Sequence, residues 1–206
     1  IPRGLDVSSN GNQVVAVFIN HSPQRPDVVY WNNALDLSGD DVDPTWHDGF
    51  NAGLRVVDMS DDGDVIAILG YVPLGVQYVW VYKNCTSRAG PQNQTYNLNY
   101  SLGTGPIEPT LALSDNGQYV VTSGFWGDYI YFFNTSMVGE WAPQWRYKLM
   151  INASAVEWVK AVDVSRDGST VVAVTNIKII QDSNETRLPH SFVIFRDATS
   201  KTGDIS

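Results

Sequence analysis

The chain has 206 residues, and 43% of them are hydrophobic, a content typical of a packed globular protein and unlike that of a disordered one. The formal net charge is −9, and the 13 Lys and Arg residues are scattered singly. This excludes nucleic acid as a partner, because binding to a phosphate backbone needs a clustered basic stripe. No apolar run approaches the roughly 20 residues that span a bilayer, so we expect no membrane span. The chain begins at Ile1-Pro2 and not at Met, which predicts a removed signal peptide, a longer parent chain, or both.

A short pattern recurs four times and predicts how the chain is organised. Its order is apolar, any residue, apolar, Ser, any residue, Asp or Asn, Gly, and it occupies residues 5–11, 57–63, 111–117 and 162–168. The closing glycines, which are Gly11, Gly63, Gly117 and Gly168, lie 52, 54 and 51 residues apart. The apolar triplet predicts a short strand, and the Asx-Gly pair predicts a tight hairpin whose two central residues both have positive φ.

Each repeat continues with further strands. The run after the hairpin is almost continuously apolar, which predicts a strand covered on both faces. An aromatic and β-branched third strand follows, and a weaker fourth strand ends the unit, as expected for an exposed outer strand. In chain order the expected strands are 5–7, 14–19, 28–31 and one around Trp46; 57–59, 65–69, 78–82 and 96–100; 111–113, 119–122, 129–133 and 145–149; and 162–164, 171–175 and 192–195.

Radially repeated units of four antiparallel strands define a β-propeller, so the predicted fold class is all-β with four-stranded propeller blades. The repeats resemble the WD40-like and PQQ-like β-propeller repeats of secreted and cell-surface proteins, most closely where Pro143–Tyr147 leads into Val162–Gly168. The resemblance implies an architecture and leaves the activity open, since propellers host enzymes, adhesins and scaffolds. A fragment at Asp197–Gly203 is similar to the quinoprotein docking pattern, but the chain ends before the Trp of that pattern.

We expect one propeller region over residues 1–206, with repeats at about 4–53, 54–108, 109–158 and 159–206. The last of these repeats is incomplete, since it lacks an outer strand. Because propellers close with about four to eight blades, the four repeats are expected to be part of a larger ring. Unseen sequence would complete the last blade, or a strand from a neighbouring subunit would do so and make the protein self-assembling and filament-forming.

Asn-x-Ser/Thr triplets are unusually dense and point to N-linked glycans. The seven triplets begin at Asn20, Asn84, Asn93, Asn99, Asn134, Asn152 and Asn184. On the predicted strand map each lies in a connection or at a strand end, where a glycan would be exposed. Glycosylation would indicate a secretory route and an extracellular or cell-surface location. The alternative is that Asn and Ser, as turn residues, gather in loops without any sugar.

Three aspartates share one position in the repeat, where the third repeat has Ala112: Asp6, Asp58 and Asp163. If they lined a central channel, they could attract a cation. They could instead accept hydrogen bonds from the adjacent blade and lock the blades together, which is the interpretation we favour.

An acidic loop after the third strand of the first repeat holds Asp36, Asp40, Asp41, Asp43 and Asp48. Its spacing is not that of an EF-hand, since the required Gly and Glu are missing. Asp40, Asp41 and Asp43 are therefore weak candidates for calcium, and a solvated acidic loop is the favoured interpretation.

The remaining residues with reactive or binding potential form no catalytic motif. The three histidines, His21, His47 and His190, are far apart in sequence and are expected on the surface or in loops. Trp126 and Trp141 could stack on sugar rings, although packing at blade edges is the expectation. Cys85 is the only cysteine, so it either pairs outside these residues or stays a partly buried thiol.

These observations predict a non-enzymatic, N-glycosylated extracellular propeller with a structural or adhesive role, for example in a surface layer or filament, that needs no cofactor. Its partners would be proteins, either copies of itself or further blades of the same chain. Two alternatives stay open: a quinoprotein-like or other propeller enzyme whose site lies in blades outside this sequence, and a receptor propeller that binds protein or glycan.

Overall fold

The structure is a computed structural model that describes residues 2–19, 27–39, 42–49, 52–72, 75–92, 96–104, 110–123, 129–137, 141–149, 151–152, 155–181, 184–187 and 191–205. These residues form four β-sheets, which we call blades 1 to 4, together with short 3-10 turns. No helix within the described ranges is long and apolar enough to cross a membrane. The all-β prediction is therefore confirmed.

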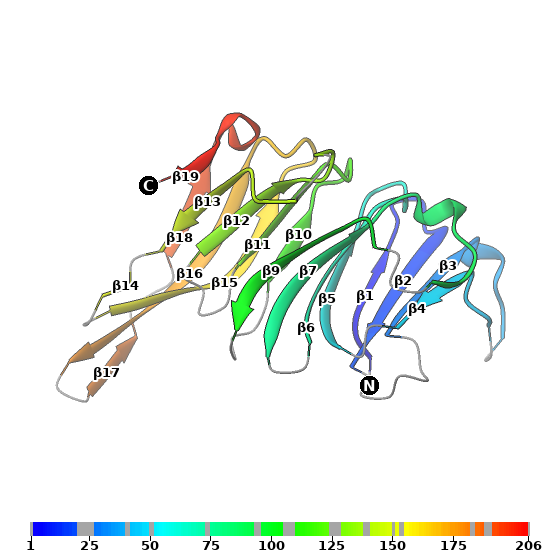
Figure 1. Cartoon of the computed structure of the whole chain (residues 1–206), viewed down its shortest axis with the longest axis horizontal. Coiled ribbons are helices and arrows are strands. Elements are labelled where there is room, and N and C mark those ends of the chain that lie inside the picture. The colour runs from blue at the N-terminus through cyan, green and yellow to red at the C-terminus, as the bar shows by residue number, and fades with distance from the viewer. Residues whose placement is uncertain are drawn as a thin grey trace.

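The blades follow the repeats in order (Figure 1). Blade 1 consists of β1 (Pro2–Val7), β2 (Gln13–Phe18), β3 (Val28–Asn32), β4 (Trp46–Asp48) and the added β8 (Gly90–Gln92). Blade 2 consists of β5 (Gly53–Met59), β6 (Ile66–Tyr71), β7 (Val76–Tyr82) and β9 (Leu98–Thr104). Blade 3 consists of β10 (Leu111–Leu113), β11 (Tyr119–Ser123), β12 (Tyr129–Asn134), β13 (Trp145–Lys148) and the added β19 (Gly203–Ile205). Blade 4 consists of β14 (Ile151–Asn152), β15 (Ala155–Val164), β16 (Val171–Gln181), β17 (Asn184–Arg187) and β18 (Ser191–Phe195).

The blades stand side by side in an arc. First strands of successive blades contact one another, β1 with β5, β5 with β10 and β10 with β15, so that every blade packs on the next. The first strand of the chain, β1, lies in blade 1 at one end of the arc, whereas the last strand, β19, is added to the outer edge of blade 3 (Figure 1). Between each pair of blades lies one apolar cluster, and the second strands β2, β6 and β11 are buried on both faces for most of their length. Burial on both faces explains why the sequences of these strands are almost continuously apolar.

Two short strands cross from one repeat to another. β8, in the third-to-fourth-strand connection of blade 2, pairs in parallel with β4 of blade 1, and β19 pairs in the same way with β13 of blade 3. Each is only three residues long and begins with a glycine, so its sequence carries no strand signal. β16 also runs past the predicted end at residue 175, and its extension pairs with β17 in a hairpin that projects from blade 4 (Figure 1).

The hairpin that joins the first two strands differs from the expected two-residue turn. In the first repeat the amide of Gly11 donates to the carbonyl of Ser8 at 2.9 Å, and the amide of Ser8 donates to the carbonyl of Gln13 at 3.0 Å. The turn is thus longer, and of its residues only Gly11 has a positive φ, 73°. The other three repeats are alike, so the prediction that the Asx residue also takes a positive φ was wrong.

The Asx residue is required for its side chain. In the first repeat Asn10 Oδ1 accepts hydrogen bonds from the hydroxyl of Ser8 and from the amide of Asn12, both at 2.8 Å. The Ser8 hydroxyl oxygen accepts in turn from the amide of Gln13 at 2.9 Å. The same three bonds recur in the other repeats. The Ser-x-Asx-Gly signature therefore encodes a hydrogen-bonded turn.

Candidate interaction face

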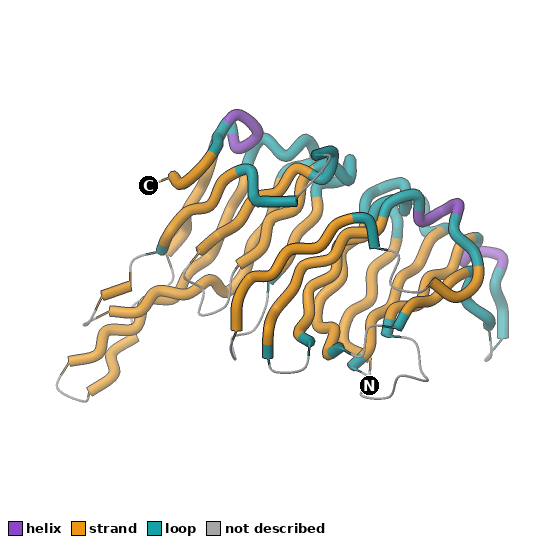
Figure 2. Tube along the Cα trace, in the orientation of Figure 1, coloured by secondary structure: helices purple, strands orange, loops and turns teal. Residues whose placement is uncertain are grey.

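The four signature turns lie at the same end of the blades, where the connecting loops gather (Figure 2). We call this surface the turn face and define it as residues 8–12, 60–64, 114–118 and 165–169. Neighbouring turns are joined through backbone hydrogen bonds. The amide of Ser9 donates to the carbonyl of Asp61 at 3.0 Å, and the amide of Asp61 donates to the carbonyl of Asp115 at 2.9 Å. Residues from four distant parts of the sequence thereby form one continuous polar surface.

The charged residues of the turn face are mostly acidic, and its one cation bridges two of them. The Arg166 guanidinium lies 3.0 Å from Asp61 Oδ2 and 3.9 Å from Asp115 Oδ2, and 76% of its side chain is exposed. Hydrogen bonds from Ser169 and Ser165 lower the pKa of Asp167 to about 2. Asp167 is thus ionised at neutral pH, and the face offers fixed carboxylates and an accessible guanidinium to a partner.

Three 3-10 turns extend this face: η1 (Ala34–Asp36), η2 (Cys85–Ser87) and η4 (Ala198–Ser200). Each follows a third strand and is preceded by a residue in the left-handed conformation, which is Asn33, Asn84 or Asp197. The first amide of each 3-10 turn donates to the signature hairpin of its own blade, as from Cys85 to the carbonyl of Asp64 at 3.0 Å. A pattern in the sequence could have predicted these 3-10 turns. In repeats 1, 2 and 4, an Asn or Asp is followed directly by Ala or Cys, and a Gly follows six residues after the Asn or Asp.

Two tryptophans on fourth strands join neighbouring blades through these turns. Trp145 is fully buried, stacks on Phe132 with ring centroids 5.0 Å apart, and donates from Nε1 to the carbonyl of Ala198 at 2.7 Å. Trp46 makes the equivalent bond to the carbonyl of Cys85 at 3.0 Å. The fragment at Asp197–Gly203 therefore does receive a docked tryptophan, which comes from the preceding blade and not from later sequence.

Two of the three repeated aspartates form bonds across blade boundaries. Asp6 Oδ2 in blade 1 accepts from the amide of Met59 in blade 2 at 2.7 Å, and Asp58 Oδ2 in blade 2 accepts from the amide of Leu113 in blade 3 at 2.7 Å. Asp163 lies in blade 4, is exposed, and bonds through Oδ1 to the amide of Val164. These are the contacts that we expect if the aspartates hold neighbouring blades together.

Asp6 and Asp58 also lie close enough to influence each other. The amide of Met59 donates to Asp58 Oδ1 at 2.9 Å as well as to Asp6 Oδ2. Burial, and next the negative charge of Asp6, raise the pKa of Asp58 to about 7. Protonation of Asp58 removes the repulsion between the two carboxylates. Within the described residues no group of three or more His, Cys, Asp or Glu side chains could hold a metal ion.

The predicted sequons are placed as follows. Asn84 is exposed at the start of η2, and Asn99 is exposed near the start of β9. Asn134 ends β12 and accepts through Oδ1 from the amide and hydroxyl of Ser136, the acceptor residue of its own sequon. Asn152 lies in β14 and Asn184 begins β17. Asn20 and Asn93 lie outside the described residues.

The acidic loop of the first repeat is divided by the fold. Asp43 is exposed, whereas Asp48 lies in β4, is buried, and accepts from the Tyr82 hydroxyl at 2.6 Å. Asp48 is thus a packing residue between blades 1 and 2 and no part of a solvated loop. Burial, together with this carboxylate, raises the pKa of Tyr82 above its ordinary value. Asp40 and Asp41 lie outside the described residues.

Among the histidine, tryptophan and cysteine candidates, the structure places His47, Trp141 and Cys85. His47 lies in β4 and is half-buried, while His21, His190 and Trp126 lie outside the described residues. Trp141 is buried, packs on Phe133 with centroids 4.4 Å apart, and donates to the carbonyl of Asn134. Cys85 is fully buried, and burial raises the pKa of its thiol.

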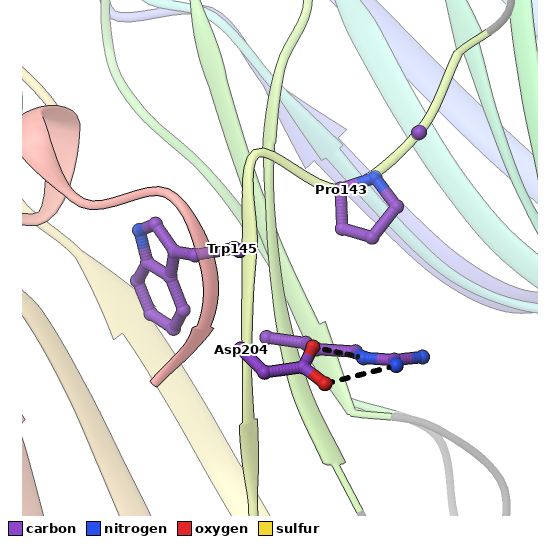
Figure 3. Close-up of a pocket in the computed structure, with 6 residues that line it drawn as sticks. Pro143, Trp145 and Asp204 are labelled. Atoms are coloured by element: carbon purple, nitrogen blue, oxygen red, sulfur yellow. Dashed lines mark hydrogen bonds and ion pairs between the residues drawn. The ribbon is translucent and has the colours of Figure 1, made fainter. Parts of the chain in front are cut away.

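One shallow pocket of about 210 Å³ lies at the outer edge of blade 3, lined by Ala142, Pro143, Trp145, Arg146, Gly203 and Asp204. Its polar end is closed by an ion pair, in which Arg146 Nε and Asp204 Oδ1 are 2.5 Å apart (Figure 3). Ligand pockets are typically about 300–1,000 Å³. Because the pocket is smaller and its charged groups already pair, the turn face is the stronger candidate for an interaction site.

Comparison with known proteins supports the architecture. No family model and no curated protein matches the sequence. Among solved structures, the chain is similar to one in the mitotic checkpoint complex, with a TM-score of 0.54 and 14% identity over 92% of this chain and 51% of that one. It is similar to one in a complex of KlAtg21 with the coiled-coil of AgAtg16, with a TM-score of 0.56 and 14% identity over 92% and 57%. It is also similar to Kuenenia stuttgartiensis hydrazine synthase, with a TM-score of 0.54 and 12% identity over 86% and 52%.

The class of protein follows from the blades and from these similarities. The chain forms β-propeller blades with a WD40-like fold, and it spans about half the length of the matched chains. At these identities the likeness concerns the fold alone.

Proposed function

We propose that the chain belongs to a non-enzymatic propeller that binds other proteins through its turn face. The observation that carries the proposal is the convergence of four signature turns into one polar surface, in which exposed Arg166 bridges Asp61 and Asp115. Loops held on a rigid scaffold are where binding residues concentrate in proteins. Two of the similar structures are structures of protein complexes, which supports such a role.

We further propose that the protein is secreted, N-glycosylated, and structural or adhesive at a cell surface. The density of sequons motivates this, and Asn84 and Asn99 expose their side chains as a glycan requires. The test is expression through a eukaryotic secretory pathway, followed by intact mass measurement before and after glycosidase treatment. We expect a loss of mass that shrinks in Asn84→Gln and Asn99→Gln variants. An unchanged mass would rule out glycosylation.

The binding role is tested on the secreted protein with a charge-reversed turn face. Arg166→Glu places a third negative group beside Asp61 and Asp115, and Arg55→Glu, away from this surface, serves as the matched control. Each is offered to immobilised wild-type protein and to a glycan array. Self-binding that Arg166→Glu weakens and Arg55→Glu does not is the expected result for a structural protein. Binding to glycans alone would favour the receptor alternative, and a bound quinone absorbance would favour an enzyme.

A further inference from the structure

Two of the fourth strands are covered along their outer edge by an added strand. β8 pairs in parallel with β4, and β19 pairs in parallel with β13. Both added strands follow a 3-10 turn and begin with a glycine of positive φ, Gly90 at 67° and Gly203 at 70°. The outer edge of a blade in this fold therefore accepts a further strand when one is presented to it.

β9, the fourth strand of blade 2, has no such cover among the described residues, where it pairs with β7 alone. Counted from the signature glycine, Leu98 occupies the position that Trp46 and Trp145 hold in blades 1 and 3. A leucine has no N–H group in its side chain, so it cannot bond to a 3-10 turn of the next blade as these tryptophans do. Within the described part of the chain β9 thus leaves a seven-residue edge open, whereas the covered strands β4 and β13 have three and four residues.

β9 also lacks the charges that keep exposed edges apart. Its sequence, Leu98–Thr104, holds no charged residue, whereas the covered strands contain Asp48 in β4 and Arg146 and Lys148 in β13. A long, uncharged edge strand pairs readily with another chain, because it presents a row of backbone N–H and C=O groups without partners. A second copy of this chain offers the same edge, so two β9 strands can pair with each other.

A sequon lies within this strand. Its first and third residues, Asn99 and Ser101, are both exposed. Leu98 and Tyr100 pack against the apolar cluster between blades 2 and 3, and successive side chains of a strand point to opposite faces. Asn99 and Ser101 therefore point away from blade 3. A chain that paired with β9 would bring its own side chains alongside Asn99 on the same face, where a bulky N-glycan would lie.

Two more sequons lie in edge strands. Asn152 is in β14 and Asn184 is in β17, the two edge strands of the sheet in the order β14-β15-β16-β17, which reaches beyond the other blades (Figure 1). The covered strands β4 and β13 contain no sequon. The sequons at Asn84 and Asn134 lie beside the turn face instead, because the residue after each donates its amide to the signature hairpin of its own blade. Sequons in the described strands thus coincide with open sheet edges.

We propose that an N-glycan on Asn99 prevents two copies of the chain from pairing through the open edge of β9, and that glycans on Asn152 and Asn184 do the same at the edges of blade 4. The inference rests on the proposed N-glycosylation and gives it a position-specific role. With these edges closed, the turn face is left as the surface through which copies bind one another.

The test removes the glycan on Asn99 and leaves Asn99 itself unchanged. Ser101→Ala destroys the sequon, and Ser101→Thr, which keeps the sequon at the same exposed position, is the matched control. Both proteins are expressed through a eukaryotic secretory pathway, their intact masses are compared, and light scattering after size-exclusion chromatography measures self-association. We expect Ser101→Ala to lose one glycan and to associate at a concentration at least about tenfold lower than Ser101→Thr.

Two further variants distinguish edge protection from a general loss of solubility. Ser101→Lys removes the same glycan but places a charge on the edge, so it should associate no more than Ser101→Thr. Asn84→Gln removes a glycan that lies away from the sheet edges, and it should also leave self-association at the wild-type level. Hydrogen exchange locates the contact: residues 98–104 should exchange at least about tenfold more slowly in associated Ser101→Ala, and the turn face should not.

A Ser101→Ala protein that has lost the glycan and associates no more than Ser101→Thr would overturn the inference. Association of Ser101→Lys or Asn84→Gln equal to that of Ser101→Ala would also overturn it, as would slowed exchange in the turn face and not in β9. Each of these results would leave the proposed glycosylation standing. An unmodified Asn99 in the wild-type protein would instead contradict glycosylation at this site and the inference together.

Discussion

At the scale of single residues, the repeated aspartates explain why carboxylates are placed in a largely apolar interface. Asp6 and Asp58 each accept a backbone amide of the next blade, and a buried hydrogen-bonding group left without a partner costs about 1–3 kcal/mol. The arrangement brings Asp6 and Asp58 close together, and stability then depends on the protonation of Asp58.

Asp58 should make stability depend on pH. Its pKa is raised from 3.8 to about 7 in the folded chain, so its protonated form favours folding below about pH 4 and this stabilisation is lost as the pH rises through 7. We expect the melting temperature to rise as the pH falls from 8 to 5, after allowance for other groups. Asp58→Asn should flatten this part of the profile, because its neutral amide mimics the protonated acid. An unaltered profile in Asp58→Asn would contradict the assignment.

Substitution of a signature glycine by Ala should be more destabilising where the preceding blade packs against that glycine. Gly11 and Gly168 have nearly equal φ values, 73° and 76°, so Ala at either position has the same left-handed strain of about 1–2 kcal/mol. Only at Gly168 does the new Cβ also meet Tyr119 of the preceding blade. Chemical denaturation should therefore show Gly168→Ala to be the more destabilising by about 1–3 kcal/mol. Equal losses would mean that Tyr119 moves aside freely.

At the scale of elements, each fourth-strand tryptophan connects two blades. The indole of Trp145 fills the space between Phe132 in its own blade and Phe195 in the next, with centroids 5.0 Å from each ring, and its Nε1 bond holds η4. Trp46 lies between Tyr30 and Tyr82 in the same way. The outer strands are thus anchored by one large side chain and need little sequence pattern of their own.

Replacing these tryptophans should separate docking from simple packing. Trp145→Phe removes the bond to the Ala198 carbonyl and leaves a cavity, for which we expect a loss of about 2–4 kcal/mol in the free energy of unfolding. Trp141→Phe is the matched control, because its longer bond to Asn134 stays within one blade, and a loss of about 1 kcal/mol is expected. The measurement is urea denaturation followed by circular dichroism. A smaller loss for Trp145→Phe than for Trp141→Phe would refute docking across blades.

At the scale of the whole molecule, stability should be distributed as in other repeat proteins, where each unit is supported by its neighbours. Blades 2 and 3 are covered on both faces, whereas blades 1 and 4 are covered on one. Hydrogen exchange measured by mass spectrometry should therefore be slowest in β6 and β11 and faster in β2 and β16. Uniform exchange across the four blades would indicate a single cooperative unit instead.

The order of the strands could be read from the sequence because it depends on local chemistry. Apolar alternation, continuous buried runs and the Ser-x-Asx-Gly turn are properties of neighbouring residues, and they located the first, second and third strands in each repeat. The turn was located correctly, but its geometry was not. Its geometry depends on side-chain hydrogen bonds such as that from Ser8 to Asn10, which two-residue turn rules do not include.

Residues that act between blades could be recognised only in part. Asp6 and Asp58 stood out because they repeat, yet only the fold shows that each contacts the following blade. Asp48 was assigned to a solvated loop, and the fold buries it against Tyr82 from the next repeat, 34 residues away. The sequence by itself determined an all-β chain of four similar units, since that information is local. Only the tertiary structure decided which half of each interface every unit presents, because those contacts join residues about 50 positions apart and depend on how neighbouring blades align.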